Sequence, residues 1–136
     1  MRFLRGVKLN RVNDLNNQNV PKIQKAYEKC GCNYADALER FGSETLVEKI
    51  ALKFLDDDSF SVLEEKMKGD DIYEKFRAAH GFKGVCANLG FSSLFELASE
   101  LTEKFRAGQT EGTSEIFKEL KNRQEILTGA LREAAD

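Results

Sequence analysis

The stretch DIYEKFRAAHGFKGVCANLG, residues 71–90, has the spacing of an amphipathic helix and determines the fold prediction for the chain. At about 100° per residue its apolar side chains fall on one broad stripe, which predicts a helix with one face in a hydrophobic core. Asp70 or Asp71 at its start and Gly90 at its end are typical helix boundaries. The residues of the predicted stripe are Ile72, Phe76, Ala79, Phe82, Cys86 and Leu89.

Two glycines, Gly81 and Gly84, lie inside this predicted helix, close to His80, the only histidine of the chain. A glycine in a helix interior costs about 1 kcal/mol relative to alanine, so helix stability alone does not explain them. The helical wheel places His80 off the middle of the apolar stripe, on a face that also carries Lys83 and Ala87. We therefore expect an exposed face on which small residues leave room for another molecule to reach the imidazole.

The rest of the chain also predicts helices. A period of 3.6 residues recurs, whereas alternating runs joined by hairpin signals are lacking. Connections of about two to six residues favour antiparallel packing, so the expected class is an all-α antiparallel bundle with additional short helices at its N-terminal end. The expected helices cover residues 21–30, 34–41, 43–57, 59–68, 70–89, 93–107 and 113–131.

Residues that favour helix ends support these boundaries. Capping side chains accept hydrogen bonds from the first amides of a helix, and glycine adopts the left-handed conformation that ends one. A serine followed three residues later by glutamate forms a capping box, which predicts a helix start at Ser93 with Glu96. The other expected boundary residues are Pro21, Asn33, Gly42, Ser59, Gly69, Gly108, and either Thr113 or Ser114.

Composition limits the class of protein. The 136 residues are 41% hydrophobic and 32% charged, which is typical of one soluble globular domain, here placed at residues 20–136. Residues 1–19 carry four basic side chains and one acidic one, typical of a flexible basic arm. A net charge of −2 does not indicate a nucleic-acid partner. Because no apolar run suits a membrane span or a signal peptide, we expect no membrane insertion and a cytoplasmic location.

The three cysteines do not indicate a disulfide framework or a metal centre. Cys30 and Cys32 are separated by one residue, which is not C-x-x-C spacing, and an odd number of cysteines is typical of reduced cytosolic thiols. A site made of these two thiols and His80 would not have a known zinc-ligand spacing. We therefore predict no metal site, and we expect Cys86 to be a small core residue.

His80 and Lys83 together have the chemistry needed to carry a phosphoryl group. A neutral imidazole has one unprotonated nitrogen that can act as a nucleophile, and a lysine one turn away can neutralise an incoming dianion. The chain has no G-x-x-x-x-G-K-[ST] loop and no kinase-like glycine-rich motif. These residues predict a phosphocarrier that has no ATP-dependent kinase activity and is not an enzyme.

The segment AHGFKGVCANLGFSSL, residues 79–94, resembles the signature of histidine-containing phosphotransfer (HPt) domains of two-component phosphorelays. The similarity extends to ALERFG at residues 37–42 and to LFELASEL at residues 94–101, and it covers about residues 20–130 in all. The positions that match the signature are His80, Phe82, Lys83, Gly84, Ala87 and Gly90.

This resemblance implies a four-helix bundle and a role for particular residues. His80 would accept the phosphoryl group at Nε2, and Lys83 would stabilise it. Gly84 would let a receiver domain dock, and the docking surface would also include Gly81, Ala87 and Arg77. The partners implied are response-regulator receiver domains and a sensor or hybrid histidine kinase. The chain would need no cofactor of its own, because the receiver supplies Mg²⁺.

The residue that orients the imidazole is left open by the sequence. The family places a longer polar side chain on the facing helix, where the register puts Thr102, so Thr102, the neighbouring Glu103 or a water are the candidates. Two other functions also stay open. The chain could bind a receiver without accepting phosphate, or it could hydrolyse the receiver's aspartyl phosphate as a phosphatase.

Overall fold

The computed structural model describes residues 20–136, and within this range it is built of helices without a strand. The expectation of a basic, flexible arm at residues 1–19 lies outside the described residues. The all-α bundle predicted from the sequence is confirmed, while the exact four-helix arrangement stays a prediction. The elements are α2 (Lys22–Lys29), α3 (Tyr34–Phe41), α4 (Glu44–Lys53), the 3-10 turn η1 (Phe54–Asp56), α5 (Ser59–Met67), α6 (Ile72–Leu89), α7 (Ser92–Arg106) and α8 (Thr113–Ala135).

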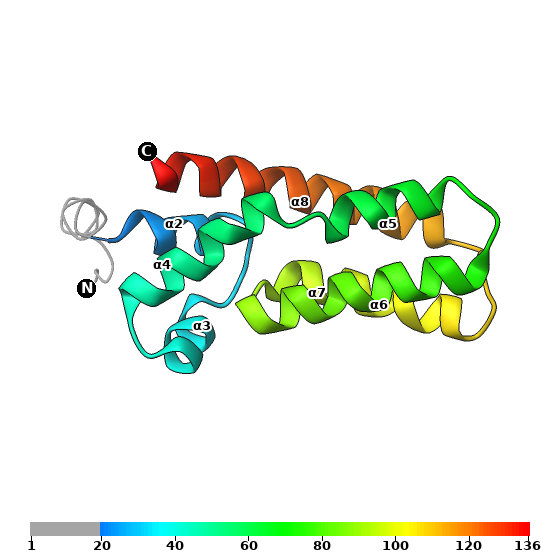
Figure 1. The fold of residues 1–136 in the computed structure, drawn as a ribbon, viewed down its shortest axis with the longest axis horizontal. Helices are drawn as coiled ribbons and strands as arrows, with labels where there is room; N and C mark the ends of the chain where they lie inside the picture. The colour runs from blue at the N-terminus through cyan, green and yellow to red at the C-terminus, as the bar shows by residue number, and fades with distance from the viewer. Residues whose placement is uncertain (1–19) are drawn as a thin grey trace, which may run out of the picture.

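Helix α6 lies between α5 and α7, and α8 packs against both α7 and α2. In Figure 1 the long helices lie lengthwise, and α2 and α3 gather at the end of the molecule where the chain terminates. Consecutive long helices run in alternating directions in this view, as their short connections favour. The short N-terminal helices therefore cover one end of the bundle and leave the length of α6 to pack between its neighbours.

The core is formed by the apolar stripes of these helices. In α6, the side chains of Ala79, Phe82 and Cys86 are completely buried, as the helical wheel predicts. The Phe82 ring lies between two other aromatic rings, with centroids 6.3 Å from Phe54 and 5.4 Å from Phe60. Edge and tilted contacts of this kind add to the apolar area that each ring buries. One face of α6 is thus fixed in the core by aromatic packing.

Several predicted helix boundaries are confirmed. The side chain of Asn33 accepts a hydrogen bond from the Asp36 amide at 2.9 Å, and Asp71 accepts one from the Glu74 amide at 3.1 Å. Gly42 ends α3 with a left-handed φ of 91°, as its position predicted. These boundaries depend on contacts within one turn of the chain, which explains why the sequence alone predicts them.

The predicted caps at Ser93 and at Thr113 or Ser114 are wrong. Helix α7 begins at Ser92 with Phe91 at its N-cap, so Ser93 lies inside the first turn, and its hydroxyl donates to the Cys30 carbonyl at 2.6 Å. Helix α8 begins after Gly112, and Thr113 donates to the Thr110 carbonyl. The single helix expected at residues 43–57 is divided, since α4 gives way to the turn η1. The Ser93 hydroxyl makes a tertiary contact, whereas the Thr113 hydroxyl bonds within its own turn.

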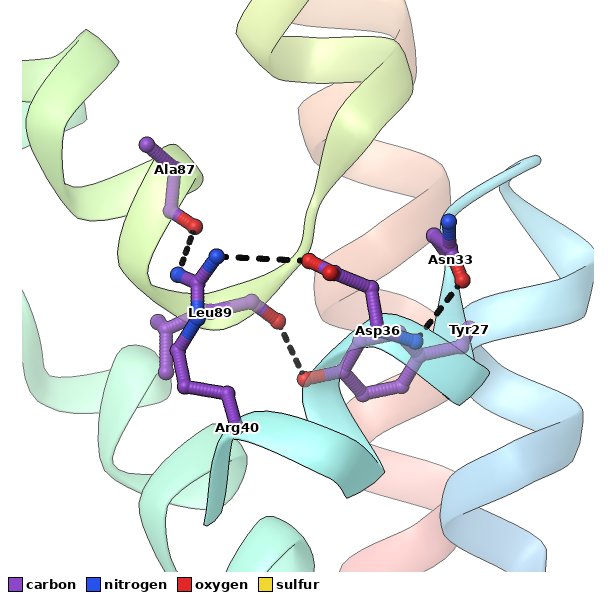
Figure 2. Close-up of polar contacts among 6 residues, drawn as sticks. All are labelled: Tyr27, Asn33, Asp36, Arg40, Ala87 and Leu89. Atoms are coloured by element: carbon purple, nitrogen blue, oxygen red, sulfur yellow. Dashed lines mark hydrogen bonds and ion pairs between the residues drawn. The ribbon is translucent and has the colours of Figure 1, made fainter.

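The C-terminal end of α6 is held by side chains from α2 and α3, as Figure 2 shows. The Tyr27 hydroxyl donates to the Leu89 carbonyl at 2.5 Å, and the Arg40 guanidinium donates to the Ala87 carbonyl at 2.5 Å. Asp36 pairs with the same guanidinium at 3.3 Å. The last carbonyls of a helix have no partner within the helix, so these bonds satisfy groups that would otherwise need water. They also fix the C-terminal end of α6, the helix that contains His80.

We predict that Tyr27→Phe destabilises the fold by about 1–3 kcal/mol, because the buried Leu89 carbonyl loses its hydrogen-bond donor. Urea unfolding followed by circular dichroism measures this change as a lower midpoint at an unchanged slope. The matched control is Tyr73→Phe, since the Tyr73 side chain is 65% exposed. We expect this control to stay within about 0.5 kcal/mol of the wild type. Equal effects of the two substitutions would contradict the assignment.

We also predict opposite effects of alanine at two glycines of this region. Gly90 has a φ of +72°, and a Cβ there would lie 3.1 Å from the Asn33 carbonyl oxygen and 3.2 Å from the Ala37 Cβ. We expect Gly90→Ala to lower the free energy of unfolding by about 1–3 kcal/mol. A Cβ at Gly81 meets nothing within 4 Å, so Gly81→Ala should raise it by about 0.5–1 kcal/mol. The same urea titration compares both variants. If both substitutions changed the free energy of unfolding in the same direction, the prediction would be wrong.

Candidate functional site

His80 lies in the middle of α6 with its side chain exposed. Within residues 20–136 its ring has no hydrogen-bond or ion-pair partner. The contact that it makes is with Phe76, one turn earlier in the helix, where the two ring centroids are 5.8 Å apart and the planes differ by 22°. The imidazole is therefore held by stacking on an apolar ring, and both of its nitrogens are left for solvent or for an approaching molecule.

Phe76 also joins α6 to α7 beside His80. The guanidinium carbon of Arg106 lies 4.9 Å from the Phe76 ring centroid, which is a cation–π contact. Arg106 in turn pairs with Glu103, with Nε and Oε1 at 3.3 Å. This chain of contacts restrains the half-buried Phe76 ring from two sides. The ring on which the imidazole stacks is thereby fixed relative to both helices.

The structure does not bring the predicted ring-orienting residues into hydrogen-bonding contact with His80. Thr102 is completely buried, and its hydroxyl donates to the Ala98 carbonyl of its own helix at 2.7 Å. Glu103 is exposed, and its carboxylate is paired with Arg106. The sequence analysis assigned Phe76 to the core and missed its contact with the imidazole. Its position four residues before His80, on the same helical face, is the signal that indicates this contact.

Lys83 lies one turn after His80 and is half-buried. In the part of the chain that the structure describes, its ammonium group has no ion pair. A long lysine stem packs its methylene groups against apolar surface and keeps its charge in water. The charge of Lys83 is consequently available to an anion that approaches the imidazole.

The predicted docking residues all lie on the exposed side of α6. Gly81, Gly84 and Ala87 are exposed, and a Cβ built on either glycine would meet no atom of another element within 4 Å. Arg77 is exposed as well, and it pairs with Glu74 at 3.6 Å. This surface, formed by Arg77, His80, Gly81, Gly84 and Ala87, is called the α6 face below. Its small residues leave the imidazole unobstructed by side chains, while their docking role stays a prediction.

Two further properties of the described residues bear on the kind of site that they form. Residues 20–136 contain no group of three or more histidine, cysteine, aspartate or glutamate side chains placed to hold a metal ion. None of the helices in the same range has the length and apolar character required to cross a membrane.

Comparison with known proteins gives one match. The family model described as the Hpt domain matches residues 44–133, which include α4, α5, α6, α7 and most of α8. No curated protein and no solved structure matches the chain. The matched range covers more than half of the 136 residues and contains His80. The chain therefore belongs to the Hpt domain family, whose members take part in histidine phosphotransfer in two-component phosphorelays.

Proposed function

We propose that this protein accepts a phosphoryl group on His80 from the aspartyl phosphate of one receiver domain and passes it to another. The observation that carries the proposal is the exposed imidazole of α6, which has no polar partner within residues 20–136 and is flanked by glycines. A histidine with a structural role would normally use its nitrogens in hydrogen bonds with the fold. Here the nitrogens are left for chemistry with another molecule.

The reaction is an in-line displacement at phosphorus. The unprotonated Nε2 of His80 attacks the phosphoryl group, the N–P bond forms, and the P–O bond to the receiver's aspartate breaks. The aspartate leaves as a carboxylate, and the imidazole keeps its proton on Nδ1. Because both phosphorylated forms are energy-rich, the step is reversible. Positioning and charge neutralisation provide most of the catalysis in phosphoryl transfer, so few side chains are needed on this protein.

Lys83 and Phe76 have separate roles in this proposal. The ammonium group of Lys83 neutralises charge on the phosphoryl oxygens, since within the described residues no carboxylate competes for it. Phe76 limits the rotation of the imidazole by stacking, at a centroid distance of 5.8 Å. The divalent cation, Mg²⁺, is contributed by the receiver. The partners are receiver domains and a sensor or hybrid histidine kinase, and the compartment is the cytoplasm.

The α6 face suits a transient protein partner. The side chains of Gly81, Gly84 and Ala87 add almost no bulk, so the receiver's backbone and phosphoaspartate can come close to the imidazole. Arg77 supplies a positive charge at the rim, where charge pairs mainly accelerate association. A small apolar centre with a charged rim is typical of short-lived signalling contacts.

We predict that His80→Gln abolishes phosphorylation by phosphorylated receiver domains, because glutamine has no nucleophilic ring nitrogen. The wild-type chain is incubated with a panel of such receivers, and the phosphoprotein is detected as an acid-labile, alkali-stable label. The variant should keep its affinity for the same receivers, which shows that it is folded. Label on the variant would refute the role of His80. Loss of receiver phosphate without any label on the wild-type chain would identify a phosphatase instead.

A second prediction concerns the space around the imidazole. Gly84→Leu should leave the fold intact, since a Cβ at this position meets nothing within 4 Å. We expect it to weaken receiver binding by about tenfold or more, equivalent to about 1.4 kcal/mol, because the leucine side chain obstructs the partner. The matched control is Gly129→Leu, because Gly129 lies on α8 and is equally free of contacts. Titration of both variants with one receiver tests this, and equal affinities would exclude Gly84 from the interface.

A further inference from the structure

Two thiols at the end of α2 lie close together and take no part in the proposed phosphotransfer. The sulfur atoms of Cys30 and Cys32 are 2.9 Å apart, and both side chains are buried. The turn between them is tight, since the Cys32 amide donates to the Tyr27 carbonyl at 2.8 Å. Gly31 has a left-handed φ of 73°, which lets the chain reverse and brings both side chains to the same side.

The two thiols are chemically unequal. A hydrogen bond joins the two sulfurs, in which either thiol can be the donor, and donation by Cys30 lowers the pKa of Cys32 to about 7. The same interaction, together with burial, raises the pKa of the Cys30 thiol. The thiolate is the reactive form of cysteine, so Cys32 is the better nucleophile of the pair at neutral pH.

Cys32 lies at the edge of the core, with 9% of its surface exposed, whereas Cys30 is 5% exposed. Cys32 lines an open cavity of about 490 Å³ at the surface, together with Gly31, Asn33, Tyr34 and Ser92. Cys86, by contrast, is completely buried in the core. Burial raises the pKa of the Cys86 thiol, which makes it an internal control for reactivity.

We propose that Cys30 and Cys32 form a redox site that is reversibly oxidised to a disulfide by low-molecular-weight disulfides. The Cys32 thiolate attacks one sulfur of the small disulfide, a mixed disulfide forms, and the other sulfur leaves as a thiolate. Cys30 then loses its proton to solvent, and its sulfur attacks the sulfur of Cys32. The second small thiolate leaves as the Cys30–Cys32 bond forms. Two electrons pass from the protein dithiol to the small disulfide, which is reduced to two thiols.

Hydrogen bonds connect the turn that carries the two thiols to the segment between α6 and α7. The Cys30 carbonyl accepts the Ser93 hydroxyl at 2.6 Å, and the Asn33 amide donates to the Gly90 carbonyl at 3.1 Å. The thiol turn is therefore bonded to the connection between α6 and α7. The inference does not rest on the phosphotransfer function, because neither thiol contacts His80.

The test uses the full chain in anaerobic buffers that contain reduced and oxidised glutathione at defined ratios. Thiols are then blocked with N-ethylmaleimide, and the products are identified by intact mass and peptide mapping. We expect the wild-type chain to lose two hydrogens, with the disulfide mapped to Cys30 and Cys32, and to recover them in excess reduced glutathione. A folded chain whose thiols stay reduced at every ratio, while the urea-unfolded chain is oxidised, would overturn the proposal.

Variants assign the order of the steps. Cys30→Ser should stop at the mixed disulfide with glutathione on Cys32, because the second thiol is missing. Cys32→Ser should react about tenfold more slowly, since the thiolate fraction of an ordinary cysteine at neutral pH is smaller by about that factor. Cys86→Ser is the matched control and should form the same disulfide as the wild type. Faster reaction at Cys30 than at Cys32 would overturn the assignment.

A measurement on the wild-type chain is independent of how the variants fold. Limited alkylation with iodoacetamide, followed by peptide mapping, ranks the three thiols by rate. We expect Cys32 to be modified first and Cys86 last. Modification of Cys86 at the rate of Cys32 would show that the pair has no special reactivity and would overturn the proposal.

Discussion

The burial of one face of α6 against its neighbours is the constraint on which the exposed site depends. Gly81 and Gly84 together cost the helix about 2 kcal/mol relative to alanine. Burying an aromatic side chain such as Phe82 contributes about 1.5–3 kcal/mol, so the core side of the helix offsets the glycines on the other side. The hydrogen bonds from Tyr27 and Arg40 fix the last turn as well. The α6 face can consist largely of small residues because the opposite face of the helix is buried in the core.

Much of the fold follows from the sequence because it depends on local spacing. The apolar stripe of residues 72–89 and the boundary residues Asn33, Gly42 and Asp71 act within one or two turns, and their predictions are confirmed. Ser93 is different, because α7 begins one residue earlier, at Ser92, and this puts Ser93 inside the helix. Its hydroxyl donates to the Cys30 carbonyl, which is far away in sequence. Contacts between residues that are distant in sequence depend on tertiary packing, and the periodicity of the sequence does not predict them.

The candidate site shows the same division. The helical wheel of one element is enough to place His80, Lys83 and the glycines together. To predict which residues of α7 contact α6, one must also know how the two helices are rotated relative to each other. A shift of one residue in register turns a side chain by about 100°, which is the difference between the buried Thr102 and the exposed Glu103. The side chains predicted to orient the imidazole lie on α7, whereas the contact that the structure shows is with Phe76 on α6 itself.

Stacking and hydrogen bonding hold an imidazole in different ways, and the difference matters for phosphotransfer. A hydrogen bond to Nδ1 fixes the tautomer and therefore determines which nitrogen is the nucleophile. Stacking on Phe76 restrains the plane of the ring without using either nitrogen. In the proposed reaction, water or the docked receiver places the proton on Nδ1, which leaves Nε2 as the nucleophile. On this proposal, Phe76 restrains the ring in the free protein, and binding of the receiver completes the preparation of the imidazole for phosphotransfer.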